Sequence, residues 1–175
     1  QSAFNYEERG MRTIVLKPGV DTKGGQEIVS RIGAKRKVDV VLEPGAGAKE
    51  AIQKFRGNQE RHCILVDEAQ FLEPQQVDDL FWYAVNEDVP VLSYGLRTDF
   101  KGAGFPGSTR LLELAHELQE LKTICRCGKK ALFNGRKVNG KFVAEGNQVA
   151  IDGEGAVEYE SLCARCYQNE VMGIL

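Results

Sequence analysis

Four of the five cysteines in this 175-residue chain fall in two close pairs, and this spacing is typical of a metal site. One residue separates Cys125 from Cys127, and two residues separate Cys163 from Cys166. An insert of 35 residues, 128–162, lies between the pairs. Zinc prefers four soft ligands in a tetrahedron, and a closed shell of four thiolates leaves no position for a reacting water. The pairs therefore predict a structural zinc site; the alternative is four incidental thiols.

A second group of candidate residues follows the apolar segment 62–66 (HCILV), which ends at Asp67 and Glu68. An apolar strand that ends in an acidic residue is the usual form of a Walker B segment, in which the carboxylate helps to hold Mg²⁺. The adjacent Glu68 could act as a general base for a hydroxyl nucleophile. The alternative interpretation is that the two acids only cap the turn or helix that follows.

The glycine-rich segment 95–108 is a candidate ligand loop, because it holds four glycines together with Phe100 and Phe105. Such a loop can close over a small ligand, with glycines as hinges and aromatic rings stacked on a flat group. A passive surface connection would have the same composition. By contrast, segment 45–49 (GAGAK) lacks the G-x-x-x-x-G-K-[ST] arrangement that wraps a phosphate, and no such arrangement occurs in the sequence.

The elements that must position these residues alternate between strands and helices as far as residue 122. Strands are expected at 12–16, 38–42, 62–66 and 89–94, and helices at 48–55, at 74–86 and from an N-cap at Ser108 to Leu118. Residues 1–9 are expected to be the last part of a helix, with Gly10 as its terminator. Residues 21–37 are expected to form a mobile loop. Short β-like pieces follow at 131–136, 141–144, 148–151 and 157–161.

Strands that are apolar throughout and separated by helices predict a parallel sheet covered on both faces. Ligands of such sheets bind at the carboxyl ends of the strands, where Asp67, Glu68 and segment 95–108 fall. The short β-like pieces, with a cysteine pair at each end, predict a small zinc ribbon. The predicted organisation is an α/β nucleotide-binding domain over residues 1–122 and a zinc-ribbon domain over 123–175.

The bulk composition narrows the possible partners. The chain is 42% hydrophobic and 27% charged, with a net charge of −2, so there is no electrostatic reason to expect nucleic-acid or membrane binding. No apolar run approaches the roughly 20 residues that span a bilayer, and no basic-then-apolar leader is present. We therefore expect a cytoplasmic protein.

Six motifs in order resemble the type II thymidine kinases, the zinc-containing cytosolic type in its bacterial form, over residues 1 to about 167. They are FNYEERGMRT (4–13), SRIG (30–33), VDEAQF (66–71), PVLSYGLRTDF (90–100), ELKTICRCG (120–128) and YESLCARCY (159–167). The resemblance implies a P-loop NTPase-like (RecA-like) fold with a C-terminal zinc ribbon. Members of the family carry a G-K-[ST] phosphate loop upstream of the first motif, so we expect the native start to lie before Gln1.

The resemblance also implies an activity: transfer of the γ-phosphate of ATP to the 5′-hydroxyl of thymidine or deoxyuridine, in nucleotide salvage and DNA precursor synthesis. It makes Glu68 the general base and Asp67 a support for Mg²⁺, with Ala69 and Gln70 lining the same site. The substrate residues that it implies are Phe71, Leu96, Phe100, Phe105, Val149, Ile151 and Tyr159. It further implies a homotetramer, inhibition by dTTP, and an acidic–basic pair, Asp21 and Lys23, near the phosphates.

Three other functions compete with this interpretation. A degenerate relative could bind nucleoside without turnover. A zinc-ribbon module could bind nucleic acid, although the acidic balance argues against it. A zinc deaminase would need H-x-E followed by P-C-x-x-C, but His62 is followed by Cys63 and Ile64, and neither cysteine pair follows a proline.

Overall fold

The computed structural model of the protein describes residues 2–20, 27–29, 35–57, 59–148 and 156–173. The chain forms two compact units. The first comprises Gln1–Arg97 and Phe105–His116, and the second comprises Thr98–Gly104 and Glu117–Leu175. Segment 98–104 thus leaves the first unit, contributes to the second, and returns.

The first unit is built on a parallel sheet of four strands: β1 (Thr13–Pro18), β4 (Val40–Leu42), β5 (Cys63–Val66) and β6 (Val91–Ser93). Their order is β4-β1-β5-β6, and all three pairings are parallel. Leu16 of β1 lies opposite Val66 of β5, which in turn lies opposite Ser93 of β6. The predicted buried parallel sheet is confirmed, and its strands end together at one edge.

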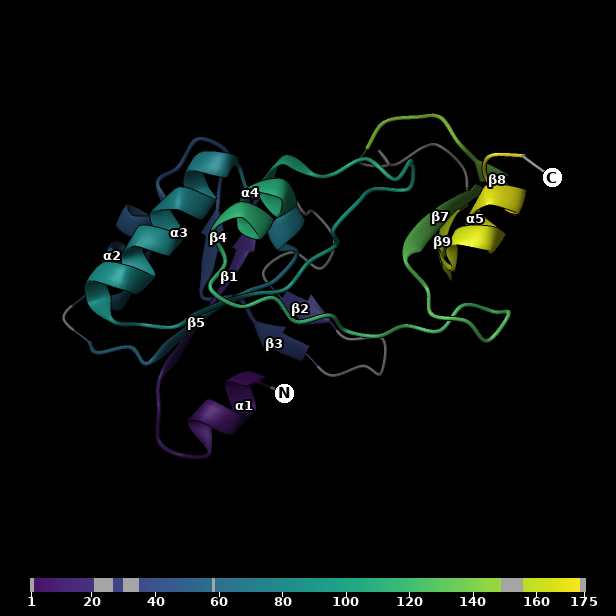
Figure 1. Ribbon diagram of the computed structural model, residues 1–175. Helices are drawn as coiled ribbons and strands as arrows, with labels where there is room; N and C mark the ends of the chain where they lie inside the picture. Colours follow the sequence, from purple (N-terminus) through teal and green to yellow (C-terminus); the bar gives the residue numbers. More distant parts are fainter. Residues whose placement is uncertain (1, 21–26, 30–34, 58, 149–155, 174–175) are drawn as a thin grey trace. The chain divides into compact units, whose positions relative to one another are not determined.

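Helices cover both faces of this sheet because alternate residues of each strand point to opposite sides. On one face lie α2 (Ala48–Arg56), α3 (Pro74–Glu87) and α4 (Pro106–Leu114), which pack on a core that includes Ile14 and Leu16 (Figure 1). On the other face α1 (Ser2–Glu7) packs against Val15 through Ala3 and Tyr6.

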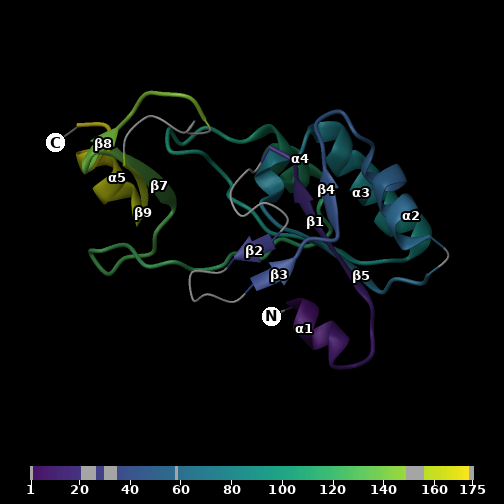
Figure 2. The same cartoon turned by 180° about the vertical axis from the view of Figure 1, so that it is seen from behind.

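Two sequence expectations in this unit were wrong. Segment 21–37 is not a loop throughout, because β2 (Glu27–Val29) pairs antiparallel with β3 (Lys35–Lys37), as Figure 2 shows from behind. Strands this short and this charged carry no readable periodicity. The last helix begins at Pro106 rather than after Ser108, because proline suits the first helical turn, and it ends at Leu114.

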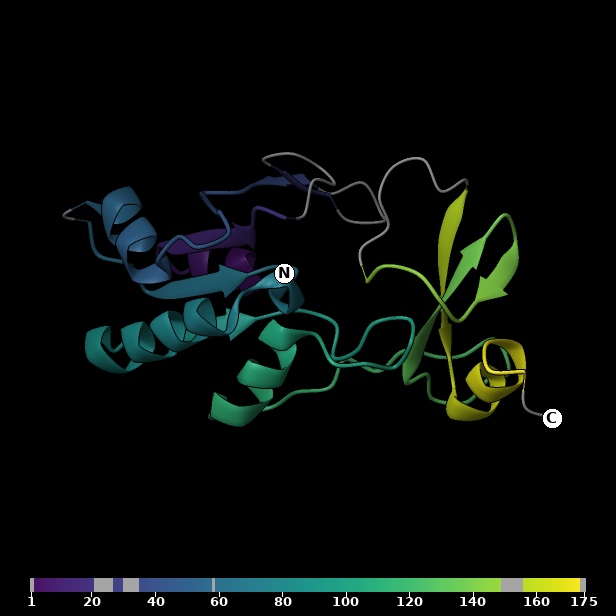
Figure 3. The same cartoon turned by 90° about the horizontal axis from the view of Figure 1, so that it is seen from above.

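The second unit contains an antiparallel sheet and one helix (Figure 3). The strands β7 (Phe133–Val138), β8 (Lys141–Val143) and β9 (Val157–Leu162) are ordered β8-β7-β9. They match three of the four predicted β-like pieces; the fourth, 148–151, lies outside the described residues after Gln148. The helix α5 (Ala164–Glu170), which was not predicted, brings Tyr167 onto the ring of Phe133 at a centroid distance of 4.5 Å. In the part of the chain that the structure describes, no helix has the length and apolar character needed to cross a bilayer.

Candidate functional site

The acidic pair lies where the central strand of the first unit ends. The backbone N–H of Asp67 donates to the carbonyl of Leu16 at 3.0 Å, which fixes Asp67 at the carboxyl edge of the sheet. Glu68 adopts a left-handed backbone with φ of 49° before the short helix η1 (Ala69–Phe71). A positive φ is uncommon in a residue other than glycine, and such conformations concentrate at functional sites. The turn after β5 therefore places the Glu68 carboxylate at the edge where ligands of parallel sheets bind.

A buried amide connects this carboxylate to the loop that follows β6. The Gln70 side chain donates through Nε2 to Oε2 of Glu68 at 2.5 Å and accepts the Leu96 N–H through Oε1 at 3.1 Å. The hydroxyl of Ser108 donates to the carbonyl of Leu96 at 2.6 Å. Both backbone groups of Leu96 are thus held by side chains. Gln70, which the sequence placed at the site only by resemblance, holds Glu68 and Leu96 at once.

Gly95 shows how closely the chain approaches at this point. A Cβ atom added there would lie 2.6 Å from Oε1 of Gln70 and 2.9 Å from its backbone nitrogen. No side chain other than hydrogen fits without moving the residue that holds the Glu68 carboxylate. The glycine is therefore required by the packing of the site.

We expect Gly95→Ala to displace Gln70, lowering kcat at least about tenfold and the free energy of unfolding by about 1–3 kcal/mol, the usual cost of overpacking. Steady-state kinetics and denaturant titration would measure both. Gly19→Ala is the matched control, because the added methyl would meet only the flexible end of the Glu43 side chain. Unchanged kcat and stability in Gly95→Ala would show that the loop relaxes freely and that Gln70 is not constrained.

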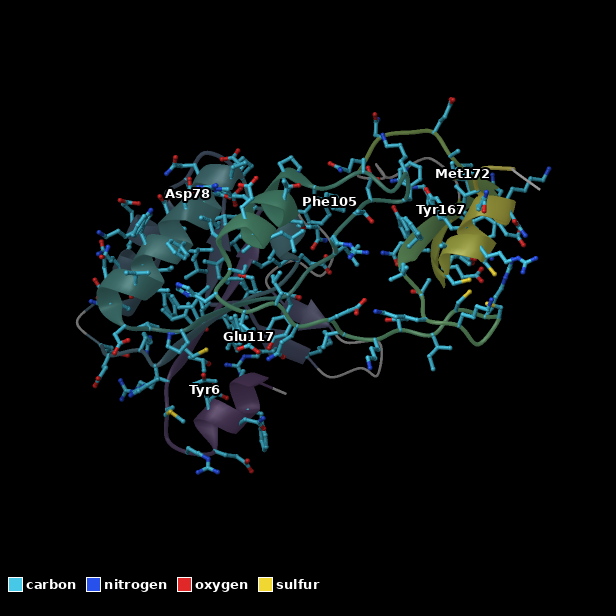
Figure 4. All side chains as sticks on the ribbon, in the orientation of Figure 1. Tyr6, Asp78, Phe105, Glu117, Tyr167 and Met172 are labelled. Atoms are coloured by element: carbon cyan, nitrogen blue, oxygen red, sulfur yellow. The ribbon has the colours of Figure 1, made fainter. Side chains whose placement is uncertain are left out.

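The apolar candidates of the first unit differ in exposure. Leu96 is 44% exposed, so it presents apolar surface at the carboxyl edge of the sheet. Phe105, at the start of α4 (Figure 4), is buried. Its ring contacts that of Phe71 edge-on at a centroid distance of 5.6 Å. Leu96 is therefore accessible from solvent, whereas Phe105 is buried and packs against Phe71.

The second unit holds the remaining described candidates. Phe100 is only 2% exposed; its carbonyl accepts the Tyr167 hydroxyl at 2.6 Å, and the guanidinium of Arg136 covers its ring at 3.8 Å. Tyr159, on β9, is 43% exposed and lies opposite Arg136 in the sheet. Its hydroxyl accepts a hydrogen bond from Nε of Arg136 at 3.1 Å. Phe100 and Tyr159 thus belong to one cluster with Arg136 between them.

Sequence reasoning did not find Arg136. A single cation in a short β-like segment normally faces solvent, and nothing in the sequence separates Arg136 from the adjacent Lys137. The substrate candidates Val149 and Ile151, like Asp21 and Lys23, lie outside the described residues.

The four paired cysteines come together in the second unit, and their Sγ atoms all lie within 4.8 Å of one another. Cys125 and Cys127 stand on a tight turn, in which the Gly128 N–H donates to the Cys125 carbonyl at 2.8 Å. Cys163 and Cys166 stand at the start of α5. The Cys127 sulfur lies 3.6 Å from those of Cys125 and Cys163, too far for a disulfide. Sulfurs around a tetrahedral zinc ion with bonds of about 2.3 Å lie about 3.8 Å apart, so the cluster fits a metal of this kind.

The electrostatics of the four sulfurs also suit a cation. Backbone hydrogen bonds from Cys127 and Cys163 lower the pKa of Cys125 to about 6, because they stabilise the thiolate. The neighbouring sulfurs of Cys127 and Cys163 raise the pKa of Cys166 to about 12, because further negative charge beside them is unfavourable. Four thiolates therefore need a cation to coexist, and a bound metal would supply it.

An acid-ended strand in a helix-covered parallel sheet, together with a four-cysteine ribbon, is the arrangement of a nucleotide-handling α/β protein whose four cysteines could hold a metal ion. The model of the family described as thymidine kinase matches residues 1–167. Among similar proteins, the thymidine kinase of Enterobacteria phage T4 is 44% identical over 97% of this chain and 86% of its own length. Thymidine kinases of Ruegeria pomeroyi and Shewanella oneidensis are each 43% identical, over 97% of this chain and 85% and 88% of their own lengths. The chain belongs to the thymidine kinase family.

Proposed function

We propose that the protein is a thymidine kinase, transferring the γ-phosphate of ATP to the 5′-hydroxyl of thymidine or deoxyuridine to give the nucleoside monophosphate and ADP. The observation that carries this proposal is the Glu68 carboxylate, held by Gln70 at the carboxyl edge of a parallel sheet in a chain of this family. Glu68 accepts the proton of the 5′-hydroxyl as its oxygen bonds to the γ-phosphorus. The bond from that phosphorus to the β-phosphate oxygen breaks, and ADP leaves.

The neighbouring residues organise the charges of this reaction. The carboxylate of Asp67 would hold Mg²⁺, directly or through water, and Mg²⁺ would supply positive charge to neutralise the phosphates. The backbone hydrogen bond from Asp67 to Leu16 holds the Asp67 main chain at the edge of the sheet, which fixes the point from which its carboxylate extends. Ala69 follows on η1, and its N–H donates to the carbonyl of Tyr94 at 2.8 Å, which joins the site to the end of β6.

Mainly apolar side chains are proposed to hold the nucleoside. The residues proposed to form the nucleoside site are Phe71, Leu96, Phe100, Phe105, Val149, Ile151 and Tyr159. The large exposed fractions of Leu96 and Tyr159 support direct contact, whereas Phe100 and Phe105, being buried, act from behind. Zinc held by the four cysteines would act indirectly: it would fix the end of β9, the strand on which Tyr159 stands four residues before Cys163.

The assembly and regulation implied by the family form a further part of the proposal: a cytoplasmic homotetramer inhibited by dTTP. Exposed apolar side chains on the outer surface of α3, Trp82 and Val85, support burial of that surface against another subunit. Light scattering coupled to size-exclusion chromatography would test the tetramer, and inhibition kinetics would test dTTP.

A phosphate-transfer assay with ATP, Mg²⁺ and thymidine tests the activity directly, using the protein as encoded, with any residues that precede Gln1. Thymidine-dependent formation of ADP is the expected result. Thymidine binding without turnover would identify a degenerate relative, and the absence of both binding and turnover would contradict the proposal.

A further inference from the structure

Arg136 is the most deeply buried charged side chain of the described second unit, at 1% exposure, and the reaction proposed above gives it no role. Burial of a charge is costly unless hydrogen bonds or other charge-stabilising contacts replace the lost water. The contacts of Arg136 all lead to segments that carry nucleoside candidates. The burial of Arg136 and the position of its contacts together indicate a role in the nucleoside site beyond packing.

Three contacts fix the guanidinium. Its Nε donates to the hydroxyl of Tyr159 at 3.1 Å, and an Nη donates to the carbonyl of Gln148 at 3.1 Å. Its flat face covers the ring of Phe100 at 3.8 Å, a cation–π contact made in a buried setting, where such contacts are strongest. Because the arginine fork is planar and rigid, these contacts together allow one orientation of the group.

Phe100, whose ring lies against the guanidinium, is itself held in place. The carboxylate of Asp99 accepts the N–H groups of Lys101 and Ala103 at 2.9 Å each, which closes segment 98–104 into a compact turn. Its other oxygen accepts the Gln148 amide at 3.2 Å. Phe100 is thus fixed on one side by this turn and on the other by the Tyr167 hydroxyl. Arg136 therefore rests on a rigid base.

The direction of the bond to Tyr159 decides what that hydroxyl can do. Because Arg136 can only donate, the Tyr159 oxygen is the acceptor, and the hydroxyl keeps its own proton for another partner. Tyr159 is 43% exposed, so that partner can be a ligand. We infer that Arg136 is a positioning residue for thymidine: it orients the Tyr159 hydroxyl as a hydrogen-bond donor toward the nucleoside. The inference rests on the proposed function, in which Tyr159 contacts the nucleoside.

Arg136→Met tests this role, since it keeps most of the side-chain length but donates no hydrogen bond. We expect its KM for thymidine to rise at least about tenfold, the usual effect of one lost polar contact. Its kcat, its KM for ATP and its metal content should stay within about threefold of the parent. Lys137→Met is the matched control on the same strand, because Lys137 pairs instead with Glu160 at 2.6 Å and with the ring of Phe142. The control should leave all these quantities within about twofold.

A double-mutant cycle separates positioning from simple structural support. Tyr159→Phe alone should raise KM for thymidine, and adding Arg136→Met to it should cause less than about a threefold further rise, because the oriented hydroxyl is already gone. Arg136→Lys, which keeps the charge but loses the fork, should give an intermediate KM. If Arg136→Met does not fold, Arg136→Lys provides the same test.

Each other outcome overturns the inference. If Tyr159→Phe raises KM but neither Arg136 variant does, Arg136 has no positioning role and the proposed function stands. If Tyr159→Phe also leaves KM unchanged in an active enzyme, the assignment of Tyr159 itself fails. If an Arg136 variant changes kcat, both KM values and metal content together, or if the two substitutions act additively, Arg136 is only a structural residue.

Discussion

Glu68→Gln lowers kcat for thymidine phosphorylation by about 10²–10⁴-fold, the range expected for loss of a general base. Glutamine has the same size and keeps a hydrogen-bond acceptor for the Gln70 amide, which bonds to Glu68 at 2.5 Å. The variant therefore retains the local packing but accepts no proton. Thymidine binding, measured by calorimetry, should stay within about threefold of the parent, because only the transition state loses an interaction.

The control for this prediction is Glu60→Gln, which removes an equal charge from an exposed position in the connection between α2 and β5. Its kcat and thymidine affinity should match those of the parent. Turnover by Glu68→Gln near the parent rate would exclude Glu68 as the base. If the variant loses thymidine affinity as strongly as turnover, Glu68 instead contributes to nucleoside binding.

Cys163→Ser reduces bound zinc from about one ion per chain to less than about a tenth of that, since a structural site needs all four ligands. Cys163 lies at the junction of β9 and α5 and is buried beside Leu162 and Tyr167. Without the metal, the two cysteine turns lose their cross-link. The end of β9 and the contacts of Phe100 with Tyr167 and Arg136 should then become disordered. KM for thymidine should rise by more than about tenfold as a result.

Metal analysis, hydrogen exchange over 133–138 and 157–162, and thymidine kinetics together measure this effect. Cys63→Ala is the matched control, because Cys63 is a buried cysteine of β5, outside the four-cysteine cluster. It should keep the full metal content. Parent-level zinc in Cys163→Ser would exclude the four-thiolate site, and lost zinc with unchanged exchange and KM would show that the metal does not order the ribbon.

The hydrophobic pattern and the cysteine spacing were sufficient, from the sequence alone, to predict the main elements and the clustering of the four paired cysteines. Apolar segments identified β1 and β5, because a strand buried on both faces is mostly apolar rather than alternating. The C-x-C and C-x-x-C pairs predicted the clustered sulfurs, because each pair brings two ligands together through local turns. The roles assigned to Glu68, to Asp67 and to the nucleoside contacts came from the family resemblance and stay proposals.

Other features were decided by tertiary structure. The pairing of β2 with β3 depends on strands of three residues, too short for any periodic signal. Gln70 connects Glu68 to Leu96, which lies 26 residues further along the chain. Arg136 is buried because Phe100, Gln148 and Tyr159 converge on it from three separate segments. Such contacts join residues far apart in sequence, and local propensity carries no information about which distant residues will meet. For this reason the sequence did not distinguish Arg136 from an exposed cation.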